Sequence, residues 1–296
     1  MLVRIDQALA WHLPGNLLKD LYPRGMRRLA EHGLFRGTHR VRTRFGFRMA
    51  VNRLDAIKWC IYYFGQFEPR ISRAFVNLLQ PGDIAIDIGG NVGYHTLLAA
   101  KLVGPSGRVL AFEPSQRNFA ELCDNIALNG FDNVVPSRVA VSDVAGTVEL
   151  YFGGENEQGN STLFPSEAGW SSEKVEAISF AQIADRCELE RVTLIKIDVE
   201  GAEGHVIRGI VPYLSRLNPE CVIFLEISPG NTGHGEELLA PFLQHGFHAR
   251  MIENEYNPEF FRSDEAVVLR DLSLVAGRIV DVVLTRDPAS LARLSG

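Results

Sequence analysis

The sequence predicts an α/β fold built on a mostly parallel sheet, and two observations support this prediction. Residues 84–88 form a short apolar run of the kind found in buried parallel strands. A glycine turn over residues 89–93 follows at once, and helical spacing continues from there to Lys101. Beyond this unit, strand-like and helix-like segments alternate, which is typical of a parallel sheet with helices on both faces.

The chain before this unit has a different character. Residues 17–32 have loose helical spacing, and residues 40–51 alternate basic with apolar side chains. This alternation predicts a two-stranded ribbon with one solvated face, bent at Gly46. We therefore divide the chain into a small N-terminal appendage, residues 1–80, and a main domain, residues 81–296, which is long enough to bury a core of its own.

The main domain continues as an alternation of strands and helices. After the glycine turn we expect strands at residues 107–112, 133–141, 147–152, 192–198, 221–226, 247–252 and 279–285. We expect helices at residues 115–129, 179–186, 202–214 and 236–245, the first of them capped by Ser115. The last strand is predicted to fold back as an edge. Residues 153–169 are rich in Gly, Asn, Ser and Glu and are predicted to be a mobile loop that can act as a lid.

The composition is that of an ordinary globular protein, with 46% apolar and 22% charged residues in a chain of 296. Four scattered cysteines form no metal-ligand pattern, so we expect free thiols in a reducing compartment. The N-terminus lacks the pattern of a secretory signal, and no apolar run approaches the ~20 residues that a membrane-spanning helix needs. We therefore expect a cytoplasmic protein without a transmembrane segment.

The charge is distributed unevenly along the chain. Residues 22–53 contain nine arginines and one acid, whereas the whole chain has a net charge of −6. This segment is either a solvated basic face or a docking patch for an anionic acceptor, a carrier or a membrane surface. The net negative charge argues against nucleic acid as a substrate, as does the absence of an Asn/Asp-Pro-Pro-aromatic stretch after a strand.

Carboxylates stand at or just beyond the ends of the expected strands. They are Asp87, Glu113, Asp143, Asp198 and Glu226. The carboxyl ends of parallel strands meet at one edge of an open α/β sheet, and ligands bind there. Asp87, Glu113 and Asp198 each interrupt a run that should be buried, where an unpaired charge is costly. These three are therefore stronger site candidates than Asp143 and Glu226, since polar residues are common at loop ends.

The glycine turn favours S-adenosylmethionine over a dinucleotide as the ligand. A dinucleotide site needs G-x-G-x-x-G, whereas this turn reads Gly-Gly-Asn-Val-Gly, with Asp87 just before it. Backbone N–H groups suit the methionine carboxylate, and a nearby acid suits the methionine ammonium. The same acid would be poorly placed beside a pyrophosphate. Glu113, one strand–helix–strand repeat later, is placed to accept the ribose hydroxyls.

A second informative stretch runs from residue 196 to residue 203. Lys196 and Asp198 lie on one face of an expected central strand, where they need each other or a ligand. They form either a structural ion pair or part of the site. The candidates for a general base are Asp198, Glu200, Glu203, His95 and His205. We prefer Asp198 or Glu200, with Lys196 holding the local charge. We expect no metal, although a metal-assisted variant would use Asp198, Glu200 and Glu226.

These stretches together resemble the FkbM family of S-adenosylmethionine-dependent methyltransferases. The residues that carry the resemblance are 65–69 (GQFEP), 81–83 (PGD), 87–93 (DIGGNVG), 112–114 (FEP), 139–143 (VAVSD), 159–162 (GNST) and 196–203 (KIDVEGAE). Gly90 departs from the family pattern, in which alanine is expected. The resemblance implies a class I (Rossmann-like) methyltransferase fold, with a seven-stranded, mostly parallel sheet in the order 3-2-1-4-5-7-6, helices on both faces and an antiparallel last strand.

The resemblance also implies roles for individual residues. The implied cofactor-binding residues are Asp87, Gly89, Asn91 and Gly93 for the methionine arm, Glu113 for the ribose, Ser142 with Asp143 for the adenine, and Glu68 for one wall of the donor pocket. The catalytic residues that we expect are Asp198, Glu200, Lys196 and His95.

The implied reaction is O-methylation of a sugar or secondary-metabolite hydroxyl by in-line displacement, with a carboxylate or histidine as general base. The acceptor would be a small molecule or a glycan, anionic or carrier-bound, and the sequence leaves a homodimer open. Two alternatives are a nicotinamide-dependent oxidoreductase and a non-catalytic nucleotide-binding module. Intact acids at both Asp87 and Asp198 weigh against the second alternative.

Overall fold

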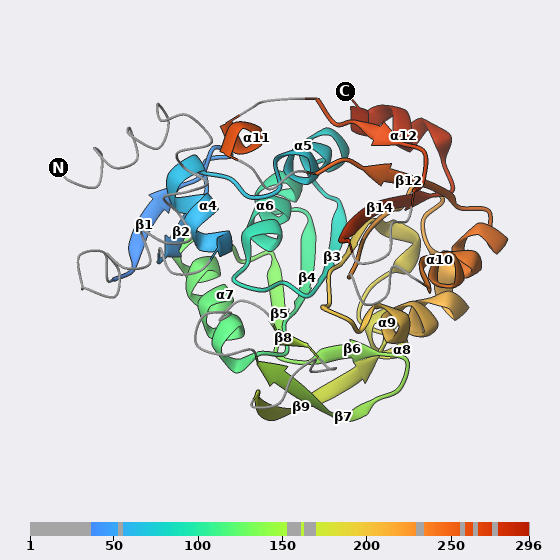
Figure 1. Ribbon diagram of the computed structural model, residues 1–296, viewed down its shortest axis with the longest axis horizontal. Coiled ribbons are helices and arrows are strands. Elements are labelled where there is room, and N and C mark those ends of the chain that lie inside the picture. Colours follow the sequence, from blue (N-terminus) through green and yellow to red (C-terminus); the bar gives the residue numbers. More distant parts are fainter. Residues whose placement is uncertain are drawn as a thin grey trace.

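The computed structural model describes residues 37–52, 56–152, 161–162, 170–228, 234–254, 258–262, 266–273 and 278–295. Its main element is an eight-stranded sheet that crosses the centre of the molecule (Figure 1). From one edge to the other, its strands are β13 (Leu269–Arg270), β12 (His248–Ile252), β14 (Val280–Thr285), β11 (Val222–Ile227), β10 (Val192–Ile197), β3 (Ile84–Ile88), β4 (Arg108–Phe112) and β5 (Val134–Ser137).

The order of these strands is that of the class I methyltransferase fold expected from the sequence. β5, β4, β3, β10 and β11 correspond to strands 3-2-1-4-5, and each is parallel to its neighbours in this series. β14 then lies between β11 and β12 and is antiparallel to both. The two-residue strand β13 pairs with β12 and adds an eighth strand to the seven expected.

One expectation about this sheet is wrong, because β14 is not an edge strand. All six of its residues are buried. β11 and β12 pair with its two sides, and side chains of β14 belong to the cores on both faces of the sheet. Burial on every side explains why its sequence, VDVVLT, is almost entirely apolar.

Helices cover both faces of the sheet (Figure 1). The helices on one face are α5 (Pro69–Leu78), α6 (Tyr94–Val103), α7 (Gln116–Asn129) and α12 (Pro288–Ser295), and those on the other are α8 (Phe180–Ala184), α9 (Glu203–Ile210) and α10 (Gly235–Gln244). Along β3, Ala85 packs in the first core and Ile86 in the second. This alternation follows from the two-residue period of a strand and assigns each side chain to one face.

Two short helices pack near the N-terminal hairpin, and one α-helix of the main domain continues as a 3₁₀ helix. α4 (Ala56–Phe64) packs on the N-terminal hairpin, and α11 (Pro258–Arg262) packs on α4. Ser115 caps α7 as expected, since its hydroxyl accepts a hydrogen bond from the Asn118 N–H at 3.3 Å. The helix expected at residues 202–214 ends as an α-helix at Ile210 and continues as a 3₁₀ helix over Val211–Arg216.

The ribbon predicted near the N-terminus is a hairpin of β1 (His39–Arg42) and β2 (Arg48–Val51), with Gly46 in its turn. Its arginines are exposed in both strands, whereas Met49 and Val51 are buried in the core beneath α5 and α6. The described part of the N-terminal appendage therefore shares a core with the main domain. The domain boundary after residue 80 stays a prediction.

Some predictions concern residues outside the described part of the chain. They are the helix at 17–32, residues 22–36 and Arg53 of the basic segment, and most of the loop at 153–169. Within the described ranges no helix is long and apolar enough to cross a membrane. All four cysteines are described, and each is a free thiol, as expected.

The strand expected at residues 133–141 proves to be two strands in different sheets. β5 ends at Ser137, and the chain then enters a second sheet in the order β6-β9-β7-β8, which lies at the bottom of Figure 1. Its strands are β6 (Ala140–Ser142), β7 (Gly146–Phe152), β8 (Ser161–Thr162) and β9 (Ser171–Ser179). Pro136, which lacks an N–H, is tolerated because β5 is an edge strand. The sequence pattern of residues 133–141 does not indicate this change of sheet.

The glycine turn after β3 is fixed by close contact with β10 and β4. The N–H groups of Gly89 and Gly90 donate to the Phe112 carbonyl at 2.9 and 3.0 Å. Gly89 has a φ of +89°, and a Cβ at this position would lie 1.8 Å from the carbonyl oxygen of Asp198. Only glycine therefore fits between the ends of β3 and β10.

We predict that Gly89→Ala destabilises the protein much more than Gly104→Ala does. Gly104 also has a positive φ, +63°, but a Cβ there meets nothing within 4 Å. Gly104→Ala should therefore cost only the conformational strain, about 1–3 kcal/mol, and lower the melting temperature by about 2–4 °C per kcal/mol. Gly89→Ala adds a backbone collision, and thermal unfolding followed by circular dichroism should show at least twice that shift. Equal shifts for the two variants would contradict the close approach of β3 and β10.

Candidate active site

Strand alternation places the charged side chains of the site on one face of the sheet, the face covered by α5 and α6. In each of β3, β10, β11 and β14 the charged residue lies two positions from an apolar residue of that core, so both side chains point to the same face. The pairs are Asp87 with Ala85, Lys196 with Leu194, Glu226 with Phe224, and Asp281 with Val283. The charged members therefore gather where this core meets the carboxyl edge of the parallel strands.

The direction of β14 brings a further carboxylate to this edge. Because β14 is antiparallel, its beginning lies beside the end of β11, and Asp281 is directly opposite Glu226. On the other side of β11, Lys196 in β10 is directly opposite Asp87 in β3. The predicted site residues of β3 and β10 are thus neighbours, as expected, and Asp281 joins them.

Asp87 is buried, and one of its two carboxylate oxygens has no hydrogen-bond donor. Its Oδ2 accepts a hydrogen bond from the Thr96 hydroxyl at 2.5 Å. Its Oδ1 is buried and accepts none from any described residue. Burial raises the pKa of Asp87, and the nearby Lys196 ammonium opposes this shift. A buried carboxylate oxygen without a donor, next to a glycine turn, fits a ligand that brings an ammonium group.

Glu113 fixes the same turn from the end of β4. Its two carboxylate oxygens accept hydrogen bonds from the backbone N–H groups of Asn91 at 2.8 Å and Ser115 at 2.9 Å. Burial raises the pKa of Glu113 to about 7, although both hydrogen bonds oppose the shift. Asn91 has a φ of +48°, a conformation that is uncommon outside glycine. Glu113 therefore lies beside the turn, where the ribose of an adenosine was expected.

Lys196 and Asp198 form a close ion pair. The Lys196 Nζ atom is 2.6 Å from Asp198 Oδ2, and the lysine is 5% exposed. Burial alone would lower the pKa of Lys196, but the carboxylates of Asp198 and Asp87 raise it above its usual range. Lys196 is therefore a buried ammonium close to several acids, and its ion pair with Asp198 is present in the structure.

Glu200 and Glu203 differ in what their carboxylates do. Glu200 is half-buried, and burial, followed by the charges of Asp198 and Glu203, raises its pKa to about 7. Glu203 is fully buried and accepts hydrogen bonds from the Ser228 N–H at 3.1 Å and the Ser228 hydroxyl. Glu203 thereby ties the start of α9 to the loop after β11, a structural role. Of these two candidates, Glu200 is therefore the better placed to act as a base, since the Glu203 carboxylate is engaged by Ser228.

His95 and Glu68 meet above the sheet. His95 Nε2 lies 3.5 Å from Glu68 Oε2, and the two side chains are 6% and 2% exposed. Burial, and then the Lys196 charge, lower the pKa of His95 well below its usual range, so its imidazole is neutral. Glu68 has a φ of +43° directly before Pro69. Both predicted residues therefore reach the same small space beside Lys196.

Ser142 and Asp143 lie elsewhere than expected from the strand pattern. Ser142 is the last residue of β6 in the second sheet and Asp143 follows it, so Asp143 does not stand at the end of a main-sheet strand. Asp143 Oδ1 is 3.0 Å from His205 Nδ1, and Oδ2 accepts a hydrogen bond from Arg208 Nε at 2.8 Å. These contacts with α9 hold the pKa of Asp143 well below its usual range. The adenine-facing role of both residues stays a prediction.

Two residues of this edge were not singled out in the sequence. Asp281 interrupts the apolar run at 279–285, the same signal that pointed to Asp87 in β3. Thr96, the donor to Asp87, gave no signal because it is one of many polar residues on a helix.

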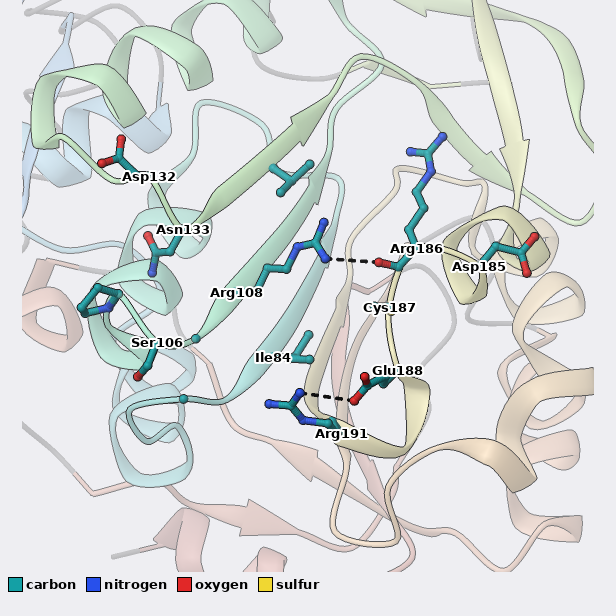
Figure 2. A pocket seen from close by; sticks show the side chains of 14 residues that line it. Ile84, Ser106, Arg108, Asp132, Asn133, Asp185, Arg186, Cys187, Glu188 and Arg191 are labelled. Carbon is teal, nitrogen blue, oxygen red and sulfur yellow. Dashed lines mark hydrogen bonds and ion pairs between the residues drawn. The ribbon is translucent and has the colours of Figure 1, made fainter.

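Part of the site lines a small cleft at the carboxyl edge. Its polar lining consists of Glu68, Lys196, Asp198, Glu226 and Asp281, with Ile71 and Phe224 among the apolar side chains. A larger groove of about 650 Å³ lies at the opposite edge, where β3 and β4 begin with Ile84 and Arg108 (Figure 2). There Arg108 and Arg191 bond to the Arg186 carbonyl and the Glu188 carboxylate. The length of the strands separates this groove from the residues described above.

Comparison with known proteins identifies the family. Residues 87–255, more than half of the chain, match the model described as "Methyltransferase FkbM domain". The chain belongs to the FkbM methyltransferase family. Members of this family are S-adenosylmethionine-dependent, and Asp87, with its unsatisfied buried oxygen, is the first residue of the match.

Three curated relatives illustrate the family. Methyltransferase sdnD of Sordaria araneosa is 31% identical over 45% of this chain and 62% of its own length. The hexuronic acid methyltransferase AglP of Haloferax volcanii is 26% identical over 55% of this chain and 63% of its own. The 31-O-demethyl-FK506 methyltransferase FkbM of Streptomyces tacrolimicus is 30% identical over 45% of this chain and 61% of its own. The chain thus spans about six-tenths of the length of the relatives it matches.

Proposed function

We propose that this FkbM-family chain transfers a methyl group from S-adenosylmethionine to a hydroxyl oxygen. The observation that carries the proposal is the unsatisfied buried oxygen of Asp87, a residue of the strand that leads into the glycine turn that Glu113 holds in place. S-adenosylmethionine supplies an electrophilic methyl group on a sulfonium, together with an ammonium that needs a buried carboxylate. Membership of the family supports the same conclusion.

The chain's own groups would bind the donor by its polar parts. Asp87 would accept the ammonium, and the backbone of the turn, from Gly89 through Asn91 to Gly93, would hold the methionine carboxylate. Glu113 would accept the ribose hydroxyls. We retain Ser142 and Asp143 for the adenine and Glu68 for a wall of the pocket. The positive φ values of Asn91 and Glu68 support roles for both, because such strain concentrates at functional sites.

We propose a sugar or secondary-metabolite hydroxyl as the acceptor. The names of two relatives, a hexuronic acid methyltransferase and a 31-O-demethyl-FK506 methyltransferase, support this substrate class. A hexuronic acid is anionic, and the exposed arginines Arg40, Arg42 and Arg48 of the hairpin provide a basic surface near the N-terminus. The acceptor class is therefore compatible with the charge of the described residues.

We assign the general base to Glu200 and a positioning role to the ion pair of Lys196 and Asp198. A general base works best when its pKa lies near the operating pH, and burial raises the pKa of Glu200 to about 7. One carboxylate oxygen of Asp198 is already bonded to Lys196 at 2.6 Å, so Asp198 is better suited to hold the lysine in position. His95 is neutral and buried, and it would position Glu68 rather than take the proton.

We predict that the protein binds S-adenosylhomocysteine with a dissociation constant of about 10 µM or tighter and does not bind NADH. The product retains the ammonium and the ribose of the donor, so Asp87→Asn should weaken its binding at least about tenfold, the effect of losing one charge-assisted hydrogen bond. Isothermal titration calorimetry measures both ligands.

Asp132→Asn is the matched control for this experiment, because Asp132 lines the groove at the opposite edge. The control should bind S-adenosylhomocysteine as the unmodified chain does. Binding of NADH without binding of S-adenosylhomocysteine would favour the oxidoreductase alternative and contradict the proposal.

We predict that methyl transfer increases as the pH rises through about 7, because Glu200 must lose its proton to act as a base. Glu200→Gln should abolish this rise and lower kcat by about 10²–10⁴-fold. The measurement is transfer of a tritiated methyl group to hexuronic acids or to small-molecule fractions, over a pH series.

Asp198→Asn separates positioning from proton transfer. It should lower kcat as well, yet its residual activity should still rise with pH, with the rise shifted to lower pH because the Asp198 charge that helps to raise the pKa of Glu200 is gone. Loss of the pH dependence in Asp198→Asn but not in Glu200→Gln would reverse the assignment of these two carboxylates.

A further inference from the structure

A second group of carboxylates lies in the cleft, and it includes Glu68, which is also retained for a wall of the donor pocket. Glu68 precedes α5, Glu226 stands near the end of β11, and Asp281 stands near the start of β14. Each offers one carboxylate oxygen, and these oxygens lie within 4.8 Å of one another. Oxygen ligands at about 2.0–2.6 Å from one cation are separated by no more than about 5 Å, so the three already have nearly the spacing of a coordination shell.

The cleft holds more negative charge than its own cation balances. Of the residues that line it, Lys196 is the one with a positive charge, and it is bonded to Asp198 at 2.6 Å. Four carboxylates and one ammonium therefore line the cleft, and a bound cation would offset this excess of negative groups.

His95 provides an independent sign of a ligand at this place. Its Nε2 atom is buried, makes no hydrogen bond with any described residue, and points at Glu68 from 3.5 Å. An imidazole nitrogen next to a carboxylate oxygen is a common ligand pair for a divalent metal. Asn254 donates to Asp281 Oδ2 at 3.3 Å, as a residue that orients a ligand would.

We propose that Glu68, Glu226 and Asp281 bind a divalent cation, with His95 beside it. Carboxylate oxygens with at most one imidazole select a hard ion such as Mg²⁺ or Mn²⁺. This assignment replaces the expectation of a metal-free site. It also differs from the metal-assisted variant that the sequence suggested.

Glu226 belongs to two possible ligand sets. We call Glu68, Glu226 and Asp281 the inner set, and the structure favours it. The outer set of Asp198, Glu200 and Glu226 also has ligand atoms within 4.8 Å of one another. Asp198, however, is already bonded to Lys196, which would compete with a cation. The inner set is more deeply buried, since Glu68 is 2% and Asp281 7% exposed.

The position of the ion gives it a role that rests on the proposed methyl transfer. A divalent cation beside Asp198 would bind the acceptor hydroxyl and lower its pKa. The proton released would pass to Glu200, and the acceptor oxygen would then form the new bond to carbon as the bond between that carbon and sulfur breaks. Binding of the ion itself requires neither donor nor acceptor.

Mn²⁺ binding to the full chain tests the proposal. After treatment with EDTA and desalting, titration with MnCl₂ followed by electron paramagnetic resonance should show one saturable site per chain with a dissociation constant below about 10⁻⁴ M. Asp281→Asn keeps the shape of the side chain and should weaken binding at least about tenfold. Glu226→Gln is a second variant with the same expected effect.

Two variants and a separate ligand complete the design. Glu200→Gln should keep the Mn²⁺ affinity within about threefold, and Asp132→Asn, at the opposite edge, should leave it unchanged. The inner site would be overturned if the chain shows no saturable Mn²⁺ binding, or if Asp281→Asn binds Mn²⁺ as tightly as the unmodified chain. If Glu200→Gln loses as much Mn²⁺ affinity as Asp281→Asn does, the outer set would be the cation site. Retained S-adenosylhomocysteine binding without Mn²⁺ binding would overturn the cation site alone, and the reverse result would overturn the proposed function alone.

Discussion

The ammonium of Lys196 is the charge on which the rest of the site depends. It is buried, bonded to Asp198 at 2.6 Å and directly opposite Asp87 in the neighbouring strand. Burial, and then the Lys196 charge, lower the pKa of His95, and the same charge stabilises the carboxylates around the lysine. One lysine stands among several acids at this edge, and burial, followed by the charges of neighbouring acids, raises the pKa of Glu113, Glu226 and Asp281. Two positively charged groups would therefore bind here: the ammonium of the donor at Asp87, and a divalent cation at Glu68, Glu226 and Asp281.

The fold explains why these groups meet. Parallel strands bring Asp87 and Lys196 to one edge, and the single antiparallel strand β14 adds Asp281 by inserting its beginning there. The two-residue period keeps the charged side chains on the face that α5 and α6 cover, and those helices contribute Glu68 and His95 from above. Gly89 lets the ends of β3 and β10 approach closely enough for the two halves to form one site.

The sequence predicted the parts of this arrangement that depend on local pattern. The apolar runs located β3, β4, β10 and β11, and acids within those runs pointed to Asp87, Glu113 and Asp198. Pattern could not show that the run at 133–141 divides between two sheets, because alternation is the same in both. It also could not place Asp281 opposite Glu226, since this contact depends on β14 entering the sheet between β11 and β12. Pairings between distant strands are set by the fold, and local sequence does not encode them.

A crystal structure of the chain with S-adenosylhomocysteine tests the central claim most directly, because it locates the ammonium of the ligand. The account predicts that this ammonium lies within hydrogen-bond distance of Asp87 Oδ1, with the ribose hydroxyls at Glu113 and the methionine carboxylate on the backbone of the glycine turn. A ligand bound in the groove at the opposite edge, or one whose ammonium leaves Asp87 Oδ1 without a donor, would contradict it.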